Sequence, residues 1–75
     1  MEKELKRIVS DPKVMGGKPV IRGTRIPVDL IIRLLAKGMT EEEILEDYPR
    51  LKKEDIKACL EYVADVVEGE VVFPA

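Results

Sequence analysis

The chain has 75 residues, of which 13 are Lys or Arg and 15 are Asp or Glu, giving a net charge of −2. It contains one cysteine and no histidine, which excludes a disulfide framework and a Cys/His metal site. A chain of this length forms one small domain whose core alone gives marginal stability. Since disulfides and metals are excluded, we expect oligomerisation to supply the rest, as a homodimer without cofactor or metal.

The composition also bears on location and chemistry. A lone cysteine and the lack of an early apolar run predict a cytoplasmic protein with no signal peptide and no membrane association. Without histidine, Ser10 has no base partner, and the single cysteine falls on a predicted helix stripe. We therefore expect that the chain is not an enzyme.

Charge is distributed unevenly along the chain. Residues 1–40 hold nine basic and four acidic residues, a balance of +5, whereas residues 41–75 hold four basic and eleven acidic ones, a balance of −7. A basic first half suits a phosphate backbone, and an acidic second half suits a basic protein. The alternative is two solvated faces that dock between subunits.

The N-terminal part predicts a charged lead-in over residues 1–7 and a short β element over residues 8–27. Within it, residues 16–28 concentrate glycine, proline and two arginines, which indicates a segment selected for backbone shape. The chain on either side of Gly23 and Thr24 is β-prone, and a glycine at the first central position favours a type II′ hairpin turn. Such a small hairpin needs a helix or a second subunit to cover it.

Local signals then predict two helices in succession. Pro27 favours a helix start, and Gly38 favours a left-handed stop. Thr40 followed three residues later by Glu43 forms a capping box at the start of the second helix. Pro49 disfavours helical backbone in the residue before it and so ends the second helix after about two turns.

The third helix begins after a weak cap, because the Lys52 side chain has no acceptor, and it ends near Gly69. One stripe is predicted to face the core, made of Ile56, Leu60, Val63 and Val67. A second, adjacent stripe suggests an interface and consists of Cys59, Tyr62 and Val66. The predicted fold is mainly α, a three-helix homeodomain-like helix-turn-helix bundle over residues 28–68 in a single domain, with a short N-terminal β-hairpin and an apolar tail at 69–75.

A helix-turn-helix of these dimensions suggests double-stranded DNA as a partner. The candidate DNA-binding residues are Arg22, Arg25, Arg50, Lys52, Lys53 and Lys57. Against this reading, acidic residues share the third helix, and the chain has no Asn or Gln for bidentate adenine contacts. The candidate dimer or partner contacts are Ile8, Val20, Ile21, Ile26, Tyr62, Val66, Val71, Val72 and Phe73.

Three motifs carry a resemblance to a known family. They read Gly17-x-Pro19-x-Ile21-x-Gly23-Thr24-Arg25-Ile26-x-Val28, Gly38-x-Thr40-x-Glu42-Glu43-Ile44-Leu45 and Tyr48-Pro49-x-Leu51-x-x-Glu54-Asp55-Ile56. The chain resembles the prokaryotic domain-of-unknown-function family 433 from about residue 8 to residue 66. The resemblance implies a homeodomain-like three-helix fold that is often dimeric. It also implies an antitoxin similar to VapB-type proteins encoded beside a PIN-like nuclease. One departure is Lys52, where the family commonly has Ser or Thr.

Two functions remain open at this point. The first is an antitoxin, a dimeric DNA-binding autoregulator that also binds a PIN-like ribonuclease toxin through its apolar tail. The second is a dimeric protein-interaction module that does not bind DNA, in which Arg22 and Arg25 pair with acidic residues of the other subunit.

Overall fold

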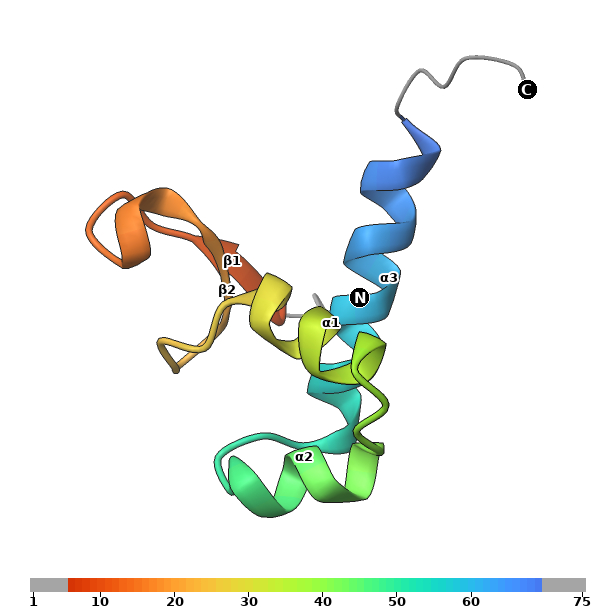
Figure 1. The fold of residues 1–75 in the computed structure, drawn as a ribbon. Helices are drawn as coiled ribbons and strands as arrows, with labels where there is room; N and C mark the ends of the chain where they lie inside the picture. The colour runs from red at the N-terminus through yellow and green to blue at the C-terminus, as the bar shows by residue number, and fades with distance from the viewer. Residues whose placement is uncertain (1–5, 70–75) are drawn as a thin grey trace, which may run out of the picture.

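The computed structural model describes residues 6–69. The elements in chain order are β1 (Ile8–Ser10), the 3-10 turn η1 (Met15–Gly17), β2 (Pro19–Ile21), α1 (Val28–Ala36), α2 (Glu41–Asp47) and α3 (Lys53–Glu68). Figure 1 shows the β-hairpin on one side, α1 in the centre, α2 below it, and α3 rising past the others. The chain therefore has the predicted mainly helical fold with a short N-terminal hairpin. Over the described range, no helix combines the length and apolar character that a bilayer crossing needs.

The two strands pair in antiparallel register, with Ile8 opposite Ile21 and Ser10 opposite Pro19. The loop between them is closed by the Ser10 hydroxyl, which donates to the carbonyl of Gly17 at 2.6 Å. Gly17 has φ of +89°, a left-handed conformation that a residue with a side chain adopts only with strain. The hairpin thus depends on a glycine in the loop and on a strand from the start of the chain.

The sequence predicts that the residues before Gly23 and Thr24 pair with the residues after them through a type II′ turn. This prediction is wrong, because β2 pairs with β1 and the turn at Gly23 has a different geometry. Only a single bridge and one bond, from the Ile21 amide to the Ile26 carbonyl at 3.0 Å, remain of that pairing. The turn closes from the Thr24 amide to the Ile21 carbonyl, so Gly23, with φ of +79°, takes the second central position, which suits type II. The Thr24 hydroxyl donates to the Ile21 carbonyl and accepts from the Ile26 amide, and this holds the turn wider than a two-residue hairpin.

The helix boundaries follow the predicted local signals. The Glu43 amide donates to the Thr40 hydroxyl at 3.1 Å, and the Thr40 amide donates to the Glu43 carboxylate at 2.9 Å, which confirms the capping box. Gly38, with φ of +98°, follows the end of α1 as predicted. Tyr48, the residue before Pro49, has non-helical backbone angles, and α2 ends immediately before it.

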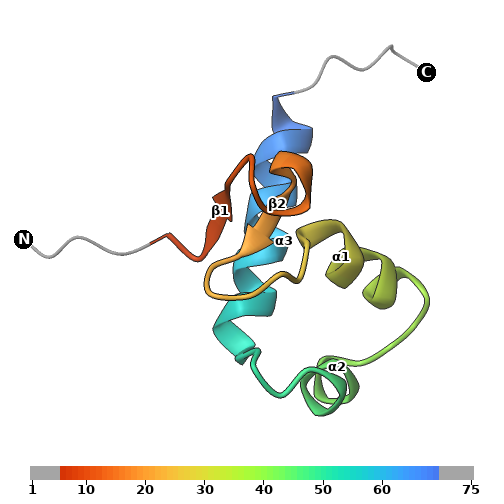
Figure 2. The ribbon, with the colours of Figure 1, turned by 90° about the vertical axis from the view of Figure 1, so that its left-hand side faces the viewer.

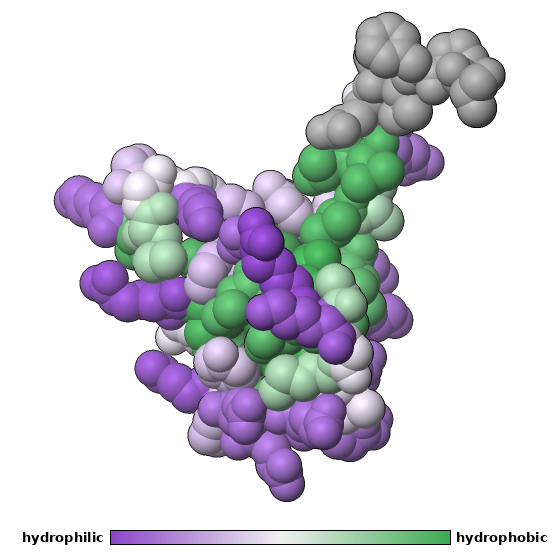
Figure 3. All heavy atoms as spheres, in the orientation of Figure 1, coloured by the Kyte–Doolittle hydropathy of each residue, from purple (hydrophilic) through white to green (hydrophobic). Residues whose placement is uncertain are grey.

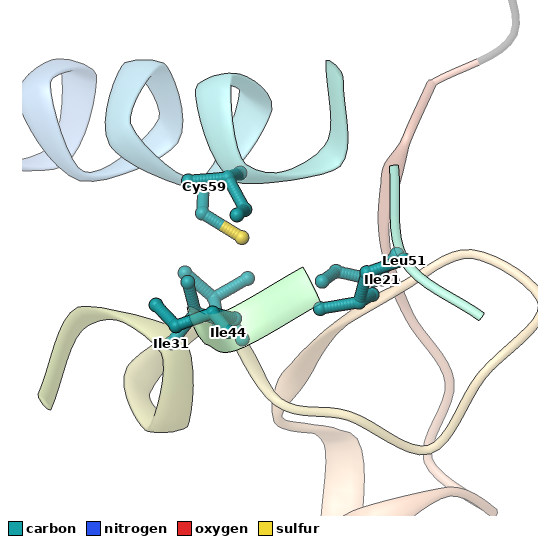
Figure 4. Close-up of a cluster of buried hydrophobic side chains, with 7 residues drawn as sticks. Ile21, Ile31, Ile44, Leu51 and Cys59 are labelled. Atoms are coloured by element: carbon teal, nitrogen blue, oxygen red, sulfur yellow. The ribbon is translucent and has the colours of Figure 1, made fainter. Parts of the chain in front are cut away.

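One core joins the hairpin to all three helices. Its buried members are Ile21, Val28, Ile31, Ile44, Leu51, Ile56 and Cys59. In Figure 4, Cys59 points from α3 toward Ile31 and Ile44, and Ile21 of β2 lies beside Leu51 of the turn before α3. The hairpin is therefore covered by helices of its own subunit.

The predicted core stripe of α3 is only partly right. Ile56 is fully buried, but Leu60 is 46% exposed and Val67 is 57% exposed, while Cys59 fills the core instead. Leu60 is turned away from the core, because Cys59 before it is buried and Val63 after it is half-buried. For Val67 the reason is length, because α3 continues beyond the layer formed by α1 and the hairpin, as Figure 1 shows. Helical periodicity gives the direction of a face but not the point at which its partner layer ends.

Candidate functional site

An open groove of about 1190 Å³ lies between the segment that enters β1, the turn before α3, and α3 itself. Its basic lining residues are Lys6, Arg7, Arg22, Arg50, Lys52 and Lys57. They come from three parts of the chain that are distant in sequence. Four of the predicted DNA-binding residues thus meet in one concavity, whereas Arg25 and Lys53 are exposed outside its lining.

Arg22 builds the N-terminal wall of this groove. Its amide donates to the carbonyl of Arg7 at 2.7 Å, and its guanidinium Nε donates to the carbonyl of Lys6 at 2.6 Å. These bonds hold the entering segment against the turn that follows β2. The sequence predicts only a charged lead-in for residues 1–7 and so misses Lys6 and Arg7. One bond joins two backbone groups, and the other joins a backbone carbonyl to a side chain 16 positions away, so neither leaves a local sequence signal.

Asp55 connects the wall to α3. Its carboxylate is buried, with the residue only 7% exposed, and its Oδ1 accepts a hydrogen bond from Arg7 Nη1 at 3.0 Å. Its Oδ2 accepts from the Lys52 amide at 3.0 Å. The second bond supplies the reciprocal half of a capping box, so the start of α3 is better capped than the Lys52 side chain predicts. Figure 2 shows β1 alongside α3, and the link joins the residue before β1 to the first turn of that helix.

The α3 side of the groove has the opposite charge. Lys57 is its single cation, whereas Glu54, Glu61 and Asp65 are exposed carboxylates in the same lining, together with Tyr62. The groove is therefore basic along the entering segment and the turn, and acidic along the middle of α3. An anion would be held by the basic wall and repelled by the helix beside it.

Other titratable groups lie away from this chemistry. Burial, and secondarily the charge of Asp55, raises the pKa of the Cys59 thiol to about 11, so it is protonated and unreactive at neutral pH. Outside the groove, a hydrogen bond from Lys18 at 3.1 Å lowers the pKa of Asp29. Over residues 6–69, no group of three or more Cys, Asp or Glu side chains is placed to hold a metal ion.

The predicted partner contacts divide into three groups. Val20 and Ile21 are wrong as partner contacts, since they are 2% and 1% exposed inside the domain itself. Ile8 and Ile26 are half-buried against the core, which leaves little of either side chain for a partner. The two contacts on α3 are exposed and available, namely Tyr62 and Val66. The last group lies outside the described residues and comprises Val71, Val72 and Phe73.

Comparison with known proteins places this geometry in a family. The family model described as "Protein of unknown function (DUF433)" matches residues 8–63. A crystal structure of a DUF433 member protein from Anabaena variabilis has a TM-score of 0.79 at 36% identity, covering 84% of this chain and 62% of that chain.

Two sequence relatives carry no assigned function. The uncharacterized protein y4eO of Sinorhizobium fredii is 40% identical over 77 residues, which is 87% of this chain and 35% of that protein. An uncharacterized protein of Archaeoglobus fulgidus is 63% identical over 30 residues, covering 40% of this chain and 83% of the relative. The chain thus spans about a third of the length of the rhizobial relative. With the family model matching most of its length and the same fold in a crystallised member, this chain belongs to the DUF433 family.

Proposed function

We propose that this chain is an antitoxin-type autoregulator whose helix-turn-helix binds double-stranded DNA through the basic wall of the groove. The observation that carries the DNA-binding half is the convergence of Arg22, Arg50, Lys52 and Lys57 with Lys6 on one concave surface. Contacts of this kind neutralise phosphates, release counterions and position a protein on a duplex.

The charge of α3 defines the mode of binding. Glu54, Glu61 and Asp65 on its groove side would oppose deep insertion of this helix between two phosphate strands. We therefore expect DNA to contact the loop between α2 and α3 and the N-terminal part of α3, where Arg50, Lys52 and Lys57 lie. Since the chain has no Asn or Gln, base reading would rest on Arg or Lys contacts to guanine.

The toxin-binding half of the proposal is supported by the resemblance to VapB-type antitoxins noted from the sequence motifs. Its predicted contact, the apolar tail at residues 71–73, lies outside the described residues. Co-expression with a PIN-like nuclease from a neighbouring gene tests it, with and without residues 71–75. Equal co-purification of both forms would exclude the tail as the binding element.

A mobility-shift titration with the DNA upstream of the gene tests the DNA-binding half. We expect binding that weakens steeply with salt. In a triple variant, Arg50→Ala with Lys52→Ala and Lys57→Ala, the slope of the logarithm of the binding constant against the logarithm of the salt concentration should be smaller by roughly 3. The matched control replaces exposed cations outside the groove, Lys13 and Lys37, and should retain the wild-type slope to within about one phosphate contact. Absence of any retention at low salt, with and without the nuclease, would contradict the proposal.

The alternative function is a protein-interaction module that does not bind DNA. The observation that favours it is the exposed apolar surface of α3, where Leu60, Val66 and Val67 are each at least 45% exposed. The mobility-shift experiment separates the two functions, because an interaction module predicts no salt-dependent DNA complex at all.

A further inference from the structure

Arg22 lies directly after β2, and its side chain crosses to the segment that enters β1. Its amide donates to the Arg7 carbonyl at 2.7 Å, which adds one bond to the antiparallel pairing beyond Ile8 and Ile21. Its Nε donates to the Lys6 carbonyl at 2.6 Å, one residue further out. Figure 2 shows the loop after β2 beside this segment. The Lys6 backbone is therefore held by a hydrogen bond from a side chain.

This bond determines where the Lys6 side chain lies. Lys6 is exposed and lines the basic wall of the groove. The next residue, Arg7, is held separately, because its Nη1 donates to Asp55 on α3. Residues near a chain end are poorly ordered unless they are tied down, and ordering a long side chain at the moment of binding costs affinity. A cation whose backbone is fixed beforehand avoids part of that cost.

The surface around this contact suits a polar partner. Figure 3 shows hydrophilic side chains around the hairpin, whereas the projecting part of α3 is apolar. The other basic residues of the wall, Arg50 and Lys52, belong to the loop before α3. Lys6 therefore extends the positive charge of the groove to a second part of the chain, outside the helix-turn-helix.

We propose that Arg22 is a positioning residue for DNA binding: its Nε holds the Lys6 carbonyl so that the Lys6 ammonium contacts a phosphate. This inference rests on the proposed DNA binding and adds a contact that the helix-turn-helix does not supply. It also separates the roles of two arginines in one turn, because Arg25 is exposed outside the groove lining. The N–H group of Arg22 is what the contact at Lys6 requires, and its charge is not.

Two neutral replacements of Arg22 isolate the hydrogen bond. Arg22→Gln carries an amide N–H at the position of Nε, whereas Arg22→Met has the same length and no donor. Nuclear magnetic resonance relaxation of the DNA-free chain measures the order of the Lys6 backbone amide. We expect an order parameter typical of rigid backbone, about 0.85, in the wild type and in Arg22→Gln, and a value below about 0.6 in Arg22→Met.

Salt titrations of the mobility shift measure the consequence for DNA. Lys6→Ala should lower the salt slope by roughly 1 in the wild type and in Arg22→Gln, because one phosphate contact is lost. In Arg22→Met the same change should have no further effect, because Lys6 is no longer held at the phosphate. The matched controls are Arg25→Gln and Arg25→Met, which should equal each other and leave the effect of Lys6→Ala intact.

The outcomes separate this inference from the proposed function. A wild-type chain that does not bind DNA would overturn both. Wild-type binding with an equal effect of Lys6→Ala in Arg22→Gln and in Arg22→Met would overturn the positioning role alone. A Lys6 amide that is equally ordered in those two variants would do the same.

Discussion

Replacing Asp55 by Ala should destabilise the domain more than any other single change at the groove. The buried carboxylate accepts from Arg7 Nη1 and from the Lys52 amide, each at 3.0 Å, and alanine removes both bonds. Loss of the helix-start bond costs about 1 kcal/mol. The Arg7 side chain is 45% exposed, so solvent screens its pair, which contributes only about 0.5–1 kcal/mol.

Together these terms predict a loss of about 2 kcal/mol in the free energy of unfolding. For a domain of this size, that loss corresponds to a melting temperature lower by about 8–16 °C. Urea denaturation followed by circular dichroism measures the first quantity and a thermal scan measures the second. Asp55→Asn keeps an acceptor oxygen for the Lys52 amide and should recover about half of the loss.

A double-mutant cycle separates the two bonds. Arg7→Met removes the charge while keeping most of the side-chain length, and its coupling to Asp55→Ala should be about 0.5–1 kcal/mol. Asp29→Asn is the control, because it breaks the solvent-exposed pair with Lys18 and should leave the free energy of unfolding close to that of the wild type. A loss below about 0.5 kcal/mol for Asp55→Ala, or a coupling of zero, would refute this reasoning.

Three further predictions concern other groups. Thr40→Ala should lower the free energy of unfolding by about 1 kcal/mol in urea while Thr40→Ser retains most of it, and equal stability of all three proteins would show that the capping box is not stabilising. The Cys59 thiol, with its pKa raised to about 11, should resist iodoacetamide at about pH 8 until urea unfolds the chain, and labelling of the native protein at the unfolded rate would contradict its burial. Because the pKa of Asp29 is lowered from 3.8 by Lys18, its contribution to stability is present above pH 3.8 and is lost as the pH falls below it. Acid titration of stability should therefore be shallower in Lys18→Met, and identical titrations would exclude the effect.

Local signals account for the parts of the fold that the sequence predicts well. Thr40 with Glu43, and Gly38, determine helix ends through groups within a few residues of one another, so their geometry is readable in order along the chain. The partner of β2 cannot be predicted in this way. Two β-prone segments, residues 8–10 and residues 25–26, could each pair with it. Both fit its pattern, and the choice depends on which one the helices cover.

The candidate site shows the same division. Basic residues in the turn and at the start of α3 are identifiable because a helix-turn-helix places them together. The contribution of Lys6 and Arg7 cannot be identified from the sequence, since Arg7 binds Asp55, which lies 48 positions away in the chain. Asp55 itself carried one readable signal, its place three residues after the helix-capping position.

The projection of α3 gives one continuous helix two unequal halves. Amides near Ile56 and Cys59 are backed by the core, so their hydrogen exchange should require opening of the whole domain. Amides after Val63 have neighbours on one side only and should exchange through local fraying, at far lower free energy. The boundary between slow and fast exchange then marks where the domain stops supporting its own helix. Any molecule that covers the projecting half would move that boundary toward Gly69, so the exchange profile reports occupancy of the helix residue by residue.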